Sequence, residues 1–277
     1  MSYQDDLIAH LIAYKRKHLG GPPAGTFRHR GQDLLYEHIL PTRGSRLNFL
    51  PESRKEIVSF LDSTPQVKLH RYFHHLNSSQ AFALNLFVPF FEGGLEASNA
   101  LLAALGQQST LVHWEPESIP DTTEGTNLDA VWETSDGTQT FCEVKLSERD
   151  FGKARLDEPH LSKLRDIYLP RLAQHLTPDL HIATAFFKSY QILRNIWHMI
   201  GAPKGQLIFL IPRGNTQLWP MLDDVLSRVS AKIRERIRVV AIEDVFDRVA
   251  VDRATPALFR VYAQRLREKY VPSNRAT

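Results

Sequence analysis

The feature that most constrains the fold of this chain is a change of sequence pattern after Gly106. Before it, apolar residues recur with helical spacing near 3–17, 31–39, 53–61 and 66–76, and Gly and Pro residues separate these stretches. After it come short runs rich in β-branched and aromatic residues, which are typical of strands. The chain must therefore combine helices with a sheet, and we expect an α/β fold.

Two helices should lead up to this change. The first is expected to begin near Ser78, because Asn and Ser residues there are favourable N-caps, and to end at Gly93-Gly94. The second, in LEASNALLAALG, should end at Gly106. The runs TLVHWEP, TNLDAVWET and TQTFCEVKLS then predict three strands.

The remaining pattern completes a simple order of elements. Helices are expected at roughly 160–175 and 184–200. The apolar run QLIFLIP, bounded by Gly205 and Pro212, predicts a buried strand, and IRVVAI resembles it. We therefore expect the order helix, three strands, helices, strand, helix, strand.

The chain has 277 residues, enough to bury a substantial core. We expect one compact unit in which a helical N-terminal extension, 1–76, packs on a domain formed by 77–277. The single cysteine, Cys142, excludes an internal disulfide and a Cys-rich zinc site. The first residues place acids before apolar residues and basic residues after them, the reverse of a secretory signal, so we expect a cytoplasmic protein that does not enter a membrane.

The charge is mildly basic, with a formal net value of +3. This permits a polyanionic partner without requiring one. Between Lys15 and Arg30 there are five Lys or Arg residues and no acid, around a flexible GGPPAG segment. The segment is compatible with a phosphate contact or with an ordinary solvated loop, and both interpretations stay open.

Two of the predicted strands carry the charged residues on which the functional prediction depends. They are TNLDAVWET and TQTFCEVKLS, joined by the tripeptide SDG that ends at Gly137. A two-residue Asp-Gly loop would place Asp129 opposite Val144, on the face away from Glu143. A three-residue loop, with Gly137 in the left-handed conformation, would place Asp129 opposite Glu143. The length of this loop therefore decides whether the two carboxylates converge.

With the three-residue loop, Lys145 joins the same face because alternate residues of a strand project together. Two opposed carboxylates repel unless something neutralises them, and a divalent cation would do so. Oxygen ligands without Cys or paired His favour Mg²⁺ or Mn²⁺ over Zn²⁺. Asp129, Glu143 and Lys145 together predict phosphodiester hydrolysis, in which the cation activates water and the lysine orients or deprotonates it. The protonation state of Lys145 stays open.

The spacing of Asp129, thirteen residues, then Glu143-Val144-Lys145 across a hairpin resembles the PD-(D/E)XK nuclease superfamily of restriction endonuclease-like proteins. SSQAFALNLFVPFF, TNLDAVWE, FCEVKLSERDFGKA and YQILRNIW are similar to blocks of a bacterial branch of it. The resemblance implies an αβββαβ core, with a central mixed sheet flanked by helices and a helical N-terminal extension. Leu128 stands where the motif has its Pro, a common departure.

The resemblance also implies residue roles. Asp129 and Glu143 would be metal ligands, and Lys145 would act on the water or the scissile phosphate. Gln191 would brace the site from the later helix. The candidates for a further carboxylate ligand are, in order of preference, Glu96 and then Glu92 or Glu115. The candidates for nucleic-acid contact are Arg149, Lys153, Tyr190, Arg194 and Asn195.

The sequence thus predicts a Mg²⁺-dependent nuclease that cuts DNA, with RNA as an alternative substrate and Mn²⁺ as a substitute metal. One rival is an inactive nucleic-acid-binding protein of the same fold. Another is a carboxylate-pair hydrolase acting on sugars, which would work in EDTA and have little use for Lys145. Cutting both strands with one site per chain would favour a homodimer.

Overall fold

The computed structural model describes residues 2–29 and 31–272. The chain divides into two compact units, which are described separately. Unit 1 consists of Met1–Leu111, Pro212–Gly214 and Ala241–Thr277, and unit 2 of Val112–Ile211 and Asn215–Val240. That residues 1–76 form an extension on a domain of 77–277 stays a prediction.

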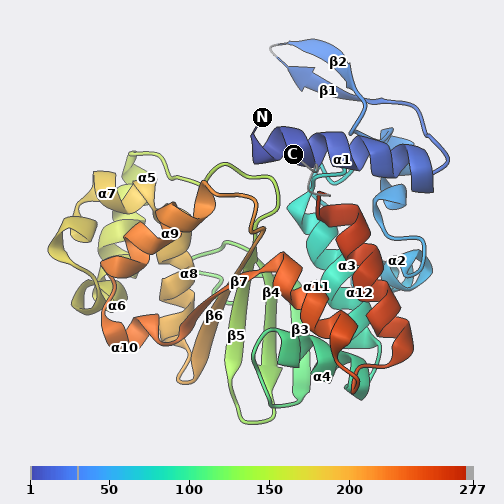
Figure 1. The fold of residues 1–277 in the computed structure, drawn as a ribbon. Coiled ribbons are helices and arrows are strands. Elements are labelled where there is room, and N and C mark those ends of the chain that lie inside the picture. The colour runs from blue at the N-terminus through green and yellow to red at the C-terminus, as the bar shows by residue number, and fades with distance from the viewer. Residues whose placement is uncertain (1, 30, 273–277) are drawn as a thin grey trace. The chain divides into compact units, whose positions relative to one another are not determined.

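Unit 2 is built on a five-stranded sheet, whose strands are labelled in Figure 1. Their hydrogen-bonded order is β3-β4-β5-β6-β7. β4 and β5 are antiparallel, and β5 and β6 are parallel, so the sheet is mixed. The strands span Leu111–Ser118, Leu128–Thr134, Gln139–Val144, Gly205–Ile211 and Ile237–Ala241. All five strands predicted from the sequence are present, and the α/β class is confirmed.

Helices connect β5 to β6 and β6 to β7 within this unit. From β5 to β6 the chain forms α5 (Glu158–Lys163), η2 (Leu164–Tyr168), α6 (Leu169–Leu172), η3 (Ala173–His175), η4 (Pro178–His181), α7 (Ala183–Lys188) and α8 (Tyr190–Gly201). From β6 to β7 it forms α9 (Leu218–Ser227) and α10 (Ala231–Arg234). The single helix expected at 184–200 was wrong in one respect: Ser189, with φ −114° and ψ 23°, leaves the helical conformation and separates α7 from α8.

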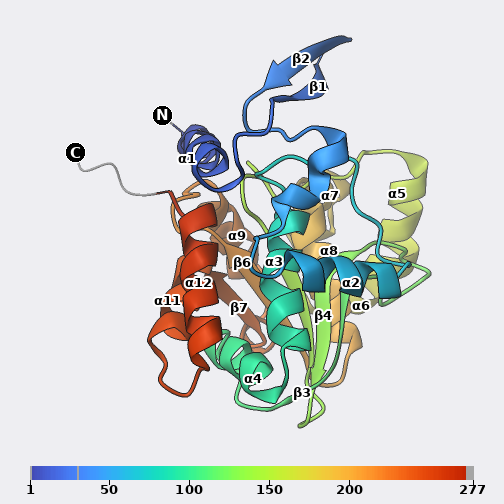
Figure 2. The same ribbon diagram turned by 90° about the vertical axis from the view of Figure 1, so that its right-hand side faces the viewer.

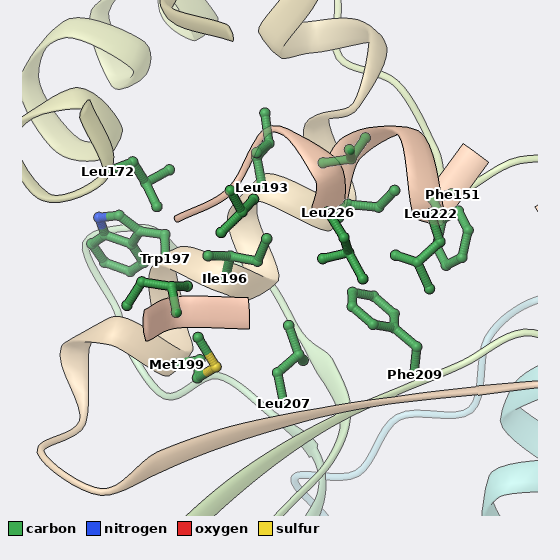
Figure 3. Close-up of a cluster of buried hydrophobic side chains, with 14 of the residues drawn as sticks. Phe151, Leu172, Leu193, Ile196, Trp197, Met199, Leu207, Phe209, Leu222 and Leu226 are labelled. Atoms are coloured by element: carbon green, nitrogen blue, oxygen red, sulfur yellow. The ribbon is translucent and has the colours of Figure 1, made fainter. Parts of the chain in front are cut away.

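The core of unit 2 forms where α8 packs against the sheet. Figure 3 shows Ile196 and Trp197 of α8 gathered with Leu207 and Phe209 of β6. β6 is buried along nearly its whole length, as its continuous apolar sequence predicted. This packing holds α8 against the sheet.

Unit 1 is mainly helical. Its helices are α1 (Tyr3–His18), η1 (Thr42–Asn48), α2 (Arg54–Ser63), α3 (Ser79–Glu92), α4 (Leu95–Ala104), α11 (Ile242–Val251) and α12 (Ala257–Tyr270), and Figure 2 shows α11 beside α12. Ser78 caps α3 as expected, because its side chain accepts a hydrogen bond from the Ala81 N–H. α11 and α12 were not predicted. Among the described residues, no helix combines the length and apolarity needed to cross a membrane.

The helix expected at 31–39 was wrong. β1 (Gly25–His29) and β2 (Gln32–Tyr36) pair as an antiparallel hairpin, and Gly31 before β2 has φ 84°. The apolar spacing misled because it does not mark a buried face: Leu35 is 71% exposed. Pairing with the preceding strand satisfies the backbone instead.

The helix expected at 66–76 was also wrong, since this segment is a series of turns. Side chains from elsewhere in unit 1 take the backbone groups that a helix would pair internally. The Asn48 amide donates to Phe73 O and His75 O, both at 2.7 Å, and the Gln80 side chain accepts from the His70 N–H at 2.7 Å. These tertiary hydrogen bonds override the local helical pattern.

Candidate active site

The β4–β5 hairpin closes through three residues, which is the alternative in which the two carboxylates converge. Thr134 N–H donates to Thr138 O at 3.0 Å, and Gly137 lies in the left-handed region at φ 77°. The strands pair Ala130 with Cys142, and continuing this register by one pair brings Asp129 opposite Glu143. The odd-length loop is therefore the local feature that puts both carboxylates on one face of the sheet.

Glu143 is the centre of this face. Its side chain is 4% exposed and both of its oxygens accept hydrogen bonds. Gln191 Nε2 donates to Oε1 at 2.7 Å, and Asn195 Nδ2 donates to Oε2 at 2.9 Å. Arg194 lies 3.8 Å from Oε2. Because α8 supplies all three of these partners, the position of this helix controls the orientation of the carboxylate.

Lys145 completes an ionic cluster with Glu143. Its Nζ lies 2.9 Å from Glu143 Oε1 and donates to Gln191 Oε1 at 2.8 Å. Burial lowers the pKa of Lys145, but Glu143, Glu148 and Asp129 outweigh burial, so the pKa is raised overall. This balance of charges favours the ammonium form of Lys145.

Asp129 is half-buried beside this cluster. Its Oδ2 accepts a hydrogen bond from the Val144 N–H at 2.7 Å. Burial, followed by the charges of Glu143 and Glu117, raises the pKa of Asp129, while Lys145 and the Val144 N–H act in the opposite direction. An extra positive charge here would stabilise the ionised form of Asp129.

Glu117 is a carboxylate that sequence reasoning missed. It lies in β3, and its charge raises the pKa of Asp129. Its backbone is left-handed, at φ 51°, which is an uncommon conformation for a residue other than Gly and costs energy. The Asn127 amide holds the Glu117 carboxylate at 3.2 Å. No signal in the sequence indicates this conformation, because regular strand alternation does not produce it.

The three further carboxylates chosen from the sequence are all exposed. Glu92 ends α3 and Glu96 lies in the first turn of α4, so both belong to unit 1. Glu115 lies in β3 of unit 2, where hydrogen bonds from Ser118 and His113 lower its pKa. The cluster described above is formed by residues of unit 2 alone.

The polar residues chosen for nucleic-acid contact fall into two groups. Arg149 and Lys153 are exposed, and Lys153 pairs with Asp150 at 3.2 Å. Arg194 is 7% exposed and Asn195 has no exposed surface, so they brace Glu143 from inside. Tyr190 is half-buried, and its hydroxyl lies 2.7 Å from that of Tyr168. Arg194 and Asn195 are thus buried beside Glu143, whereas Arg149 and Lys153 are exposed to solvent.

The carboxylates of Asp129 and Glu143 offer oxygen ligands, the kind that a hard divalent cation prefers. Among the described residues, no group of three or more His, Cys, Asp and Glu side chains is arranged to hold a metal ion. Asp129 and Glu143 are two carboxylates, the number that Mg²⁺ commonly takes from a protein while it keeps its waters. Each carboxylate oxygen has two lone pairs, so the hydrogen bonds to Glu143 do not exhaust its capacity. The residues present therefore fit Mg²⁺ or Mn²⁺.

A mixed sheet with flanking helices, with an Asp and a Glu-x-Lys motif on neighbouring strands, defines the PD-(D/E)XK, restriction endonuclease-like class. The chain belongs to the family described as Restriction Endonuclease associating with ARP, whose model matches residues 9–271. Neither the curated proteins nor the solved structures include a significant match. The family name indicates DNA nucleases.

Proposed function

We propose that this protein is a metal-dependent deoxyribonuclease that hydrolyses DNA phosphodiester bonds at the cluster of Asp129, Glu143 and Lys145. The observation that carries the proposal is the convergence of these three side chains in a chain of the restriction endonuclease family. Family membership supports DNA as the substrate, and the paired carboxylates support a metal-assisted reaction.

Asp129 and Glu143 would hold Mg²⁺, or Mn²⁺ in its place. The bound cation would activate water and offset negative charge that develops on the phosphate. A further carboxylate ligand stays a proposal, with Glu96 first and Glu92 or Glu115 as alternatives. Glu117 acts on the pKa of Asp129, and we assign it the role of keeping this side of the site negative.

The protein's own side chains position the reacting groups. Lys145 Nζ donates a hydrogen bond to Gln191, so it suits a role in holding the scissile phosphate or the attacking water. Gln191 fixes Lys145 and Glu143 relative to each other, because its amide bonds to both. Asn195 fixes the second oxygen of Glu143. The exposed Arg149 and Lys153 are proposed contacts for the DNA backbone.

Plasmid cleavage tests the proposal. With Mg²⁺ or Mn²⁺ the wild-type protein should nick or linearise plasmid, and EDTA should stop the reaction. Asp129→Ala and Lys145→Ala should each lower the rate by at least about a hundredfold, as expected for loss of a metal ligand or a charged transition-state contact. Asp223→Ala and Lys232→Ala are matched controls, since both side chains are exposed elsewhere in unit 2.

Each alternative outcome has a distinct meaning. Robust cleavage by both Asp129→Ala and Lys145→Ala would overturn the site. Tight DNA binding without cleavage in any metal would indicate an inactive binding protein. Hydrolysis of sugars in EDTA would indicate a carboxylate-pair hydrolase, and cleavage of RNA but not DNA would change the substrate.

A further inference from the structure

A second buried carboxylate, Glu124, lies in the loop between β3 and β4, outside the catalytic cluster. Its side chain has no exposed surface. Tyr168 Oη donates to Oε1 at 2.6 Å, the Thr126 N–H donates to Oε2 at 3.0 Å, and His198 Nε2 lies 3.3 Å from Oε2. Burying a carboxylate completely costs free energy unless several hydrogen-bond donors replace the lost water. Glu124 has such donors.

Glu124 is held as an ion. Burial by itself raises the pKa of the carboxyl, but hydrogen bonds from His198, Thr126 and Tyr168 outweigh burial, and the pKa is lowered overall. Lys163 adds a cation 3.9 Å from Oε1. Hydrogen bonds to an ionised acceptor are roughly twice as strong as neutral ones, so Glu124 ties its neighbours together firmly.

The donors come from separate elements that meet at Glu124. Tyr168 is the last residue of η2, a π-helical turn, and such turns are rare and frequently mark functional sites. His198 lies on α8. Tyr190, at the start of α8, has its hydroxyl 2.7 Å from that of Tyr168. One carboxylate therefore joins the β3–β4 loop, the π-helical turn and both ends of α8.

The same helix holds the catalytic cluster. Gln191 and Asn195 of α8 donate hydrogen bonds to Glu143. Gln191 directly follows Tyr190, and Asn195 lies three residues before His198. α8 is thus held between two buried carboxyl groups, Glu124 and Glu143. A second tie joins the helix to the loop, since Arg194 donates to Asn127 O at 3.4 Å, two residues before Asp129.

We propose that Glu124 is a positioning residue, which holds α8 at the rotation and height where Gln191 and Asn195 reach Glu143. The inference rests on the proposed function for its catalytic consequence, though not for its structural one. Small displacements of a bracing group are costly in catalysis, because reacting groups must meet within a few tenths of an ångström. A Glu124 that merely stabilised the fold would leave the contacts of Glu143 unchanged in every variant that folds.

The first test measures the bracing contacts without relying on activity. Tyr168→Phe removes one donor to Glu124, and its matched control is Tyr262→Phe, which removes a buried hydroxyl bonded to Ser53 and to Asn85 O in unit 1. NMR of the side-chain amides, with Asn195→Asp to assign the Asn195 signal, should show a shifted and faster-exchanging Asn195 amide in Tyr168→Phe only. Wild-type shift and exchange rate in Tyr168→Phe would overturn the proposal.

The second test uses cleavage kinetics. Glu124→Gln and Tyr168→Phe should each lower kcat about tenfold or more with KM for DNA unchanged, and Tyr262→Phe should leave both constants unchanged. In an Asn195→Ala background the effect of Tyr168→Phe should shrink to about twofold, because both changes act through the same contact. Fully additive losses would overturn the proposal.

The two tests also separate this proposal from the proposed function. If the wild-type protein does not cleave DNA with Mg²⁺ or Mn²⁺, the proposed function fails, and the amide signals still decide the role of Glu124. If Glu124→Gln does not fold, Tyr168→Phe and Tyr190→Phe remain the deciding variants, since each retains the carboxylate.

Discussion

Gly152 shows how closely single residues constrain the proposed site. It lies in the left-handed region at φ 81°, which L side chains rarely adopt. A Cβ added there would lie 3.2 Å from Gln191 Oε1, the atom that accepts the Lys145 hydrogen bond. A side chain at this position therefore strains the backbone and presses on the amide that joins Lys145 to Glu143.

Gly152→Ala should lower both stability and activity. The left-handed conformation alone costs a residue with a Cβ about 1–2 kcal/mol. Gly20→Ala is the matched control, because Gly20 has φ 70° and a Cβ added there would meet no described atom within 4 Å. Urea unfolding should show similar losses for the two variants, whereas plasmid cleavage should fall about tenfold only in Gly152→Ala. If Gly152→Ala and its control cleaved plasmid equally, cleavage would not depend on the position of the Gln191 amide.

At the scale of elements, the β1–β2 hairpin depends on the segment 66–76. The Phe27 ring of β1 meets the Tyr72 and His75 rings edge-on, at centroid distances of 5.3 and 5.5 Å. Burial, followed by the charges of His74 and His38, lowers the pKa of His75 to about 4. Among the described residues, the buried His75 Nε2 has no hydrogen-bond partner. The packing of Phe27, Tyr72 and His75 therefore favours the neutral form of the His75 ring.

The stability of unit 1 should fall in acid through His75. An unfolded His has a pKa near 6.5, so between about pH 6.5 and pH 4 the unfolded chain binds more protons than the folded one. The free energy of unfolding should decrease as pH falls through this window, by up to about 1.4 kcal/mol per pH unit. His75→Phe, which keeps the ring packing, should flatten the dependence measured by urea unfolding. His29→Gln, at an exposed position, should not; a wild-type slope in His75→Phe would contradict the assignment.

At the scale of the whole molecule, the net charge of +3 is too small to explain DNA binding by a general attraction. Binding should depend on a few local cations. Arg149 is exposed and lies five residues after the end of β5, close in sequence to Glu143 and Lys145. We therefore propose it as a phosphate contact.

Removing Arg149 should weaken DNA binding and its dependence on salt together. Each lost phosphate contact lowers the slope of log K against log salt by about 0.9 on duplex DNA. The measurement is a titration of duplex DNA with Asp129→Ala protein between about 50 and 200 mM salt. Arg149→Ala should show the smaller slope, and Arg234→Ala, exposed in α10, should keep the original one. An unchanged slope in Arg149→Ala would remove this residue from the interface.

Much of unit 2 and of the cluster could be predicted because the determinants are local. Strand alternation and the conformation of Gly137 decide which side chains share a face within a single hairpin. Asp129, Glu143 and Lys145 could therefore be named as candidates from the sequence, while the structure decided the loop length. The buried strand β6 was equally plain, because a parallel strand covered on both sides is apolar throughout.

Other features were decided only by the tertiary structure. Local spacing favoured helices at 31–39 and 66–76, but strand pairing and the side chain of Asn48 take the backbone groups concerned. The position of Glu117 depends on its left-handed backbone, and that of Glu124 on hydrogen-bond donors distant in sequence, such as Tyr168. No local sequence pattern encodes either feature. The sequence by itself determined the charges and the hairpin that presents them, because these depend on neighbours along the chain. Only the folded structure decided what surrounds each charge, because burial and long-range hydrogen bonds set its protonation and orientation.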